Sequence, residues 1–221
     1  MTNIRTKIKT KDRIIQVAVH RFNELGVQNV TSRQIAQEMG ISHGNLDYHY
    51  KTKEDLLLAI YKKMKKEMSE SYLDHKKYSN SMEHFHHLLL HLEEFQLKYQ
   101  FFNLDVLVIS RSFPKINKLL TKTLELRKHQ MDDIFKKLIS EGYLKENKNF
   151  EQGRLQHTIR IIITFWISQR EVLHNFRYKE NGEMTKHIWQ LIMPFLTELG
   201  LKEYDQLIRK YTFNDFKLSE L

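Results

Sequence analysis

The chain has 221 residues, of which 41% are hydrophobic and 29% charged, a balance that excludes a disordered chain and allows one or two globular domains. It holds only 7 Gly, 2 Pro and no Cys, which argues against a turn-rich β-sandwich or barrel and excludes disulfides and cysteine-ligated zinc. The net charge is +9, and residues 1–66 carry +7 of it, with 13 Lys and Arg against 6 Asp and Glu, so this region is either a solvated basic face or a surface for nucleic acid.

The abundance of Leu, Ile, Lys, Glu and Gln predicts an all-α fold. The first helix is expected over residues 11–25, where apolar residues recur at three- and four-residue spacing, and Gly26 follows as its stop. A second, shorter helix is expected to begin after a cap at Thr31 or Ser32 and to end near Met39.

Two further helices follow closely along the chain. Gly40 ends the second helix, and Ser42 is placed to cap a third short helix over about 43–50. Thr52 is placed to cap a fourth helix, whose first turn carries two acidic residues that suit the positive end of the helix dipole. This fourth helix runs on into the next region without a flexible linker, which predicts mechanical coupling between two domains.

The rest of the chain is expected to form longer helices with short breaks. Their expected ranges are 81–101, 102–113, 115–141, 151–176, 183–199 and 202–211, with Pro114, Gly142, Gly182 and Gly200 at the joints. We therefore predict a helix-turn-helix domain at 1–55, a connecting helix at about 53–72 and a larger helical domain at 73–221.

Residues 33–46 carry the strongest functional signal. Two short helices that cross steeply need a small residue at their contact, which Ala36 supplies, and a turn residue that tolerates positive φ, which Gly40 supplies. Apolar residues around this turn would pack on the first helix, whereas the third helix stays polar and exposed. Such a helix offers the donors and acceptors that reading base edges in a major groove requires.

Residues 11–60 resemble the TetR family of bacterial transcriptional regulators in the spacing of Gly26, the stretch 30–36, the stretch 40–46 and the stretch 48–56. The resemblance implies a homodimer that binds palindromic operator DNA and represses transcription until a small molecule binds the C-terminal domain. It implies no enzyme activity and no cofactor. A ligand-independent architectural DNA-binding protein is the alternative function.

The resemblance also implies which residues meet DNA. Arg33 would contact phosphate or a base, the start of the third helix would lie nearest the bases, and Lys53 would bind phosphate. The implied set is Thr31, Arg33, Ser42, His43, Gly44, Asn45, Asp47, Tyr48, His49 and Lys53. Asp47 departs from the family, which usually has an aromatic residue there. A carboxylate near phosphates is repelled unless it accepts from cytosine N4 or pairs with a neighbouring Lys or Arg, and we expect Asp47 to contribute to base choice.

Two strongly apolar stretches, near 101–109 and 159–167, are expected to be central in the second domain. Their aromatic and polar residues are either plain core or the lining of an effector cavity. The candidates for effector binding are Phe102, Asp105, Arg111, His157, Phe165 and Trp166.

The last two long helices carry apolar faces that fit either a four-helix dimer interface or packing within one chain. These faces consist of Ile159, Ile162, Ile163 and Trp166 on one helix and of Ile188, Leu191, Ile192 and Phe195 on the other. The sequence does not separate the two arrangements, and the family resemblance favours the dimer.

Metal binding and catalysis receive little support. His84, His87 and His91 share a helical stripe, but Glu94 and Lys98 lie on it too, so we expect a solvated polar face and no metal. No nucleophile elbow, phosphate loop or zinc-protease helix occurs.

We also expect no membrane association. The N-terminus has no apolar signal-peptide core, and the longest apolar stretch, residues 161–167, is far shorter than the ~20 residues of a membrane span. The basic residues precede no strongly apolar interfacial helix face, which disfavours a membrane-surface protein. These features predict a cytoplasmic protein.

Overall fold

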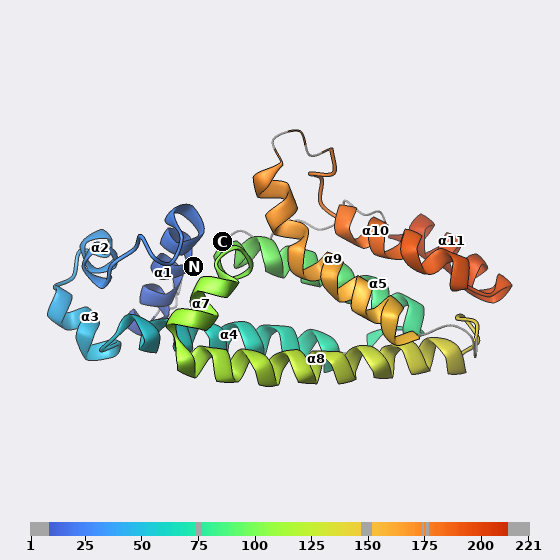
Figure 1. Ribbon diagram of the computed structural model, residues 1–221, viewed down its shortest axis with the longest axis horizontal. Coiled ribbons are helices and arrows are strands. Elements are labelled where there is room, and N and C mark those ends of the chain that lie inside the picture. The colour runs from blue at the N-terminus through green and yellow to red at the C-terminus, as the bar shows by residue number, and fades with distance from the viewer. Residues whose placement is uncertain (1–8, 74–76, 147–151, 174, 176, 212–221) are drawn as a thin grey trace, which may run out of the picture. The chain divides into compact units, whose positions relative to one another are not determined.

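The computed structural model describes residues 9–73, 77–146, 152–173, 175 and 177–211 (Figure 1). The helices are α1 (Thr10–Leu25), α2 (Ser32–Glu38), α3 (His43–His49), α4 (Lys53–Leu73), α5 (Ser81–Lys98), α6 (Gln100–Leu104), α7 (Val106–Ser112), α8 (Pro114–Ser140), α9 (Gln152–Val172), α10 (Glu183–Ile192), the 3₁₀ turn η2 (Met193–Phe195) and α11 (Glu198–Lys210). No strand occurs within these ranges, which confirms the all-α prediction. None of the described helices is both long enough and apolar enough to cross a membrane.

The described helices form two compact units. The first draws on residues 1–66 and 99–121, and the second on residues 67–98 and 122–221. The first unit therefore contains α1, α2, α3, α6 and α7, the second contains α5, α9, α10 and α11, and α4 and α8 contribute residues to both. The expected assignment of DNA binding to 1–55 and of effector binding and dimerisation to 73–221 stays a prediction.

The core of the first unit forms where the apolar stripe of α1 meets the helix-turn-helix. Ile14, Phe22, Ile35 and Leu46 are each at most 1% exposed. The ring of Phe101 in α6 lies 5.4 Å from that of Phe22, so α6 extends this core from a distant part of the chain. Leu25, the last apolar residue of the repeating pattern expected over residues 11–25, does not join this core, since it is 46% exposed.

The helix expected over 102–113 is divided. The chain forms α6 and α7 with a break at Asp105, whose backbone (φ −98°, ψ 12°) leaves the helical region. Asp105 Oδ2 accepts a hydrogen bond of 2.7 Å from the backbone amide of Val27, so a tertiary contact accompanies the break. Sequence periodicity shows only local repetition, which is why this break was not predicted.

The core of the second unit is built from aromatic residues of α5, α8 and α10. The ring of Phe85 lies 6.1 Å from that of Phe135 and 5.4 Å from that of Trp189, with edge-to-face geometry in both pairs. The apolar faces of α9 and α10 also belong to this core, since Ile159 and Ile188 are fully buried within the single chain. Packing within one chain therefore accounts for most of the two faces that a dimer interface could have used.

The end of α10 differs from the predicted helix over 183–199. The chain passes through η2, which contains Pro194, and then turns into α11 at Thr197, whose Oγ1 accepts from the Gly200 amide at 3.0 Å. Gly200 was expected at a joint, but it lies in the first turn of α11, where a Cβ would clash with the carbonyl oxygen of Tyr143. Glycine is thus required at position 200 because the backbone of α11 approaches that of Tyr143 closely, and not because the chain changes direction there.

Candidate nucleic-acid interface

The turn between α2 and α3 is fixed by local backbone chemistry. Thr31 caps α2 in a capping box, with the Gln34 amide donating to Thr31 Oγ1 at 3.3 Å and the Thr31 amide donating to Gln34 Oε1 at 2.7 Å. Gly40 adopts φ +66°, which L-residues rarely adopt, and the Ile41 amide donates back to the Ala36 carbonyl at 3.0 Å. These bonds make the turn compact and set the direction in which α3 leaves it.

Helix α3 is anchored by one apolar residue and is otherwise open. Ser42 Oγ accepts from the Asn45 amide at 3.2 Å and so caps the helix, while Leu46 is fully buried against the rest of the first unit. His43, Gly44 and Asn45 are exposed, and Tyr48 is 84% exposed. The expected polar, accessible helix is therefore present.

The side chains of His43 and Asp47 lie close together on α3. His43 Nδ1 lies 3.2 Å from Asp47 Oδ2, one helical turn away, with 45% and 41% of the two side chains exposed. The spacing of four residues on a helix signals such a pair. The sequence interpretation singled out both residues but did not connect them.

Lys53 begins α4 and is half-buried. Its Nζ lies 3.5 Å from the carbonyl oxygen of Gln28 and 6.0 Å from the centroid of the Phe22 ring. Burial lowers the pKa of Lys53, and the negative charge of Asp105 opposes this effect. Thr31, Arg33 and Ser42 are exposed around the same helix-turn-helix, whereas Asp47 and His49 are partly buried.

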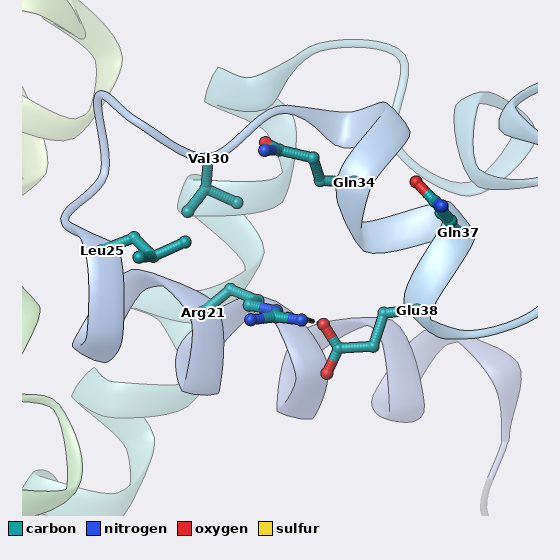
Figure 2. A pocket seen from close by; sticks show the side chains of 6 residues that line it. All are labelled: Arg21, Leu25, Val30, Gln34, Gln37 and Glu38. Atoms are coloured by element: carbon teal, nitrogen blue, oxygen red, sulfur yellow. Dashed lines mark hydrogen bonds and ion pairs between the residues drawn. The ribbon is translucent and has the colours of Figure 1, made fainter.

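A shallow hollow of about 360 Å³ lies between α1 and α2 (Figure 2). Arg21 reaches across from α1 to pair with Glu38 of α2, and Arg21 Nη1 also lies 3.2 Å from Glu24. The other lining residues are Leu25, Val30, Gln34 and Gln37. The pair of Arg21 with Glu38 links the first two helices. The lining of the hollow includes none of the six residues expected to bind an effector.

The structure divides the six effector-binding candidates between the two units. In the first unit, Phe102 is buried with its ring 5.3 Å from that of Tyr61, Asp105 bonds to Val27, and Arg111 is exposed. In the second unit, the side chains differ widely in exposure. His157 is exposed beside Arg160, Phe165 is 52% exposed, and Trp166 is buried with its ring 5.0 Å from that of His187.

The histidine stripe of α5 is not the solvated face expected from the sequence. His84 is only 4% exposed and stacks at 5.4 Å on Tyr78. The neighbouring His86, which no sequence argument singled out, is fully buried, and its Nδ1 accepts from Trp189 Nε1 at 3.1 Å. Among the described residues no group of three or more His, Cys, Asp or Glu side chains is arranged to hold a metal ion.

Comparisons with known proteins identify this arrangement. Residues 14–60 match the family of bacterial regulatory proteins named tetR, and residues 63–204 match the TetR family described as bacterial transcriptional repressors. The chain belongs to the TetR family of DNA-binding transcriptional regulators. The resemblance read from residues 11–60 is thereby confirmed.

The curated relatives in the comparison match about a quarter of the chain. An HTH-type transcriptional regulator of Staphylococcus aureus (strain bovine RF122 / ET3-1) is 40% identical over 53 residues, which are 24% of this chain and 29% of that protein. The chain thus matches less than a third of the length of these relatives.

Solved structures match over most of the chain. A TetR-family regulator from Marinobacter aquaeolei has a TM-score of 0.80 at 24% identity, covering 92% of this chain and 99% of that one. A regulator from Saccharomonospora viridis, solved in complex with choline, has a TM-score of 0.69 at 21% identity, covering 85% of this chain and 98% of that one. At these identities the two structures establish a shared fold.

Proposed function

We propose that this chain is a ligand-responsive repressor that binds palindromic operator DNA as a homodimer and leaves it when a small molecule binds. The observation that carries the DNA-binding role is the accessible α3, held by the buried Leu46 and by the turn at Gly40. A rigidly held polar helix with exposed donors and acceptors suits the major groove. Contacts with the DNA phosphates would position α3, and these would come from Arg33, Lys53 and the caps of α2 and α3.

The proposed dimer places two copies of α3 in successive major grooves, about 34 Å apart. One side of α9 is apolar and exposed within the single chain. It carries Ile161, Phe165 and Val172, which are 46%, 52% and 72% exposed. Such an exposed apolar face supports a second copy of the chain as the partner. Replacing Phe165 by Glu should then convert dimer to monomer in sedimentation and weaken operator binding. An unchanged dimer would place the interface elsewhere.

The effector is proposed to be a small molecule bound within one unit, either by candidates of the first unit (Phe102, Asp105 and Arg111) or by candidates of the second (His157, Phe165 and Trp166). Support comes from the family and from the structurally similar regulator of Saccharomonospora viridis, which was solved in complex with the small organic molecule choline. The effector can act only through different affinities for the DNA-binding and released states. The protein is proposed to act in the cytoplasm and to catalyse no reaction.

Selection of bound fragments from genomic DNA, repeated with candidate metabolites, tests the proposal. A regulator of this kind enriches a palindromic site and releases it when the effector is added. An architectural DNA-binding protein would retain fragments without sequence preference, and release by no metabolite would remove the ligand-responsive part of the proposal.

A further inference from the structure

The contact between His43 and Asp47 gives the exposed side of α3 a defined hydrogen-bonding character. His43 Nδ1 and Asp47 Oδ2 are 3.2 Å apart, and both side chains are more than two-fifths exposed. Leu46, the residue between them that is fully buried, fixes which side of the helix turns inward. The exposed fractions of the two side chains, 45% and 41%, leave the pair accessible to a partner.

A carboxylate beside one nitrogen of a neutral imidazole favours the tautomer that carries the proton on that nitrogen. A neutral imidazole has one N–H group and one lone-pair nitrogen, and the partner of one nitrogen sets the role of the other. At 3.2 Å the negative charge of Asp47 stabilises a proton on Nδ1 of His43. Nε2, at the far side of the ring, is then a hydrogen-bond acceptor.

We propose that Asp47 orients His43 so that Nε2 of His43 selects cytosine at one position of each operator half-site. Cytosine presents only the N4 amine donor in the major groove, whereas guanine presents two acceptors, thymine an acceptor and a methyl group, and adenine an acceptor beside its donor. An acceptor nitrogen on a ring whose other nitrogen faces a carboxylate matches the cytosine edge best. The acceptors of guanine repel it. This inference rests on the proposed function, in which α3 enters the groove.

The roles of the two residues are distinct. His43 is the residue that touches the base, and Asp47 is a positioning residue that acts through the imidazole. Removing either residue should therefore affect the same base position, and removing both should cost no more than removing the more important one.

The test is selection of duplexes from a random pool by the full-length chain at about pH 8, where histidine side chains are ordinarily neutral. His43→Ala, Asp47→Ala and the double variant are compared with the unaltered chain. We expect the unaltered chain to prefer cytosine at one position per half-site, and each variant to lower that preference at least about fivefold while leaving other positions unchanged. Circular dichroism should show the same helix content in all four proteins, since each side chain is more than two-fifths exposed.

Helix α1 offers a matched control. His20 Nε2 lies 3.4 Å from Glu24 Oε1 with the same spacing of four residues, outside the recognition helix. Glu24→Ala removes the carboxylate of that pair and should leave base preference unchanged at every position. Nitrogen NMR of histidine-labelled protein without DNA should also show His43 protonated at Nδ1, and Asp47→Ala should shift the proton to Nε2.

The possible failures are distinguishable. If Asp47→Ala tightens binding to every duplex equally and moves no base preference, Asp47 only repels phosphates and the inference is overturned. Effects of the two single variants at different positions, or a proton on Nε2 in the unaltered chain, overturn it as well. If the unaltered chain enriches no sequence at all, the proposed site-specific regulator itself is rejected.

Discussion

The Val27 amide donates a hydrogen bond of 2.7 Å to Oδ2 of Asp105, although the two residues are 78 positions apart. Val27 lies in the turn between α1 and α2, and Asp105 lies at the break between α6 and α7. The bond joins the helix-turn-helix to a segment from the middle of the chain within the first unit. The preceding Gly26, at φ +77°, leaves the room that the carboxylate occupies.

Asp105→Asn should destabilise the first unit. The substitution removes the charge that strengthens the bond to the Val27 amide, and its cost should be about 1–3 kcal/mol in the free energy of unfolding measured by urea denaturation. Asp133→Asn is the matched control, because the Asp133 side chain is 72% exposed and its 3.7 Å ion pair with Lys136 should contribute little. Equal stability of the two variants would show that the charge of Asp105 adds nothing measurable to the bond with Val27.

Gly26→Ala should also destabilise, by about 1 kcal/mol or more, because an L-residue is strained at φ +77° and its Cβ would lie 3.3 Å from Asp105 Oδ2. Gly153→Ala provides the opposite control. Gly153 lies in α9 with nothing within 4 Å of an added Cβ, so alanine there should stabilise the chain. The measurement is the melting temperature of both variants. A Gly26 variant that melts no lower than the unaltered chain would contradict the expected strain.

Acid should weaken the second unit through His86. Burial lowers the pKa of His86 to about 4, and the charge of His87 adds to the effect. In the unfolded chain the pKa is about 6.5. Above that pH the residue is neutral in both states, and as the pH falls towards 4 only the unfolded chain takes up the proton, so stability falls over this window by about 3 kcal/mol.

His86→Gln isolates that contribution, because glutamine can still accept from Trp189 Nε1 but does not titrate. Urea midpoints measured between about pH 7 and pH 4 should fall less steeply for the variant. His87 and His91 remain in both proteins, and burial lowers their pKa values too. The urea midpoint of the variant should therefore still fall as the pH falls. Parallel curves for the two proteins would mean that His86 takes up a proton in the folded state as readily as in the unfolded one.

Lys53→Met should weaken DNA binding evenly across sequences. Methionine keeps an apolar stem beside Phe22 but removes one positive charge, so the slope of log affinity against log salt should fall by about one. Lys136→Met, which removes a charge from an exposed position of α8, should leave that slope unchanged. A Lys53 variant that changes base preference would assign this residue to reading bases.

Local signals made most of the first unit predictable. Thr31, Gly40 and Ser42 act on their own neighbours, and the structure uses each of them at a cap or turn, as the sequence indicated. The break at Asp105 and the burial of His86 depend on Val27 and Trp189, which lie 78 and 103 residues away. Periodicity and capping rules contain no information about such distant partners.

Local sequence rules predicted the candidate site only in part. The third helix and its exposed residues followed from pattern, and the pairing of His43 with Asp47 was available from their spacing of four residues but was not recognised. By contrast, the choice between a dimer interface and intrachain packing for Ile159 and Ile188 depended on how two helices meet within one chain, which no local rule specifies.

The most direct test of a base-reading α3 is the affinity of the full-length chain for its selected duplex and for a scrambled duplex, with and without Asn45→Ala. We predict that the unaltered chain binds the selected duplex at least about a thousandfold more tightly than the scrambled one. Asn45→Ala should reduce that ratio with little change on the scrambled duplex. Equal affinity of the unaltered chain for both duplexes, or an unchanged ratio in the variant, would contradict these predictions.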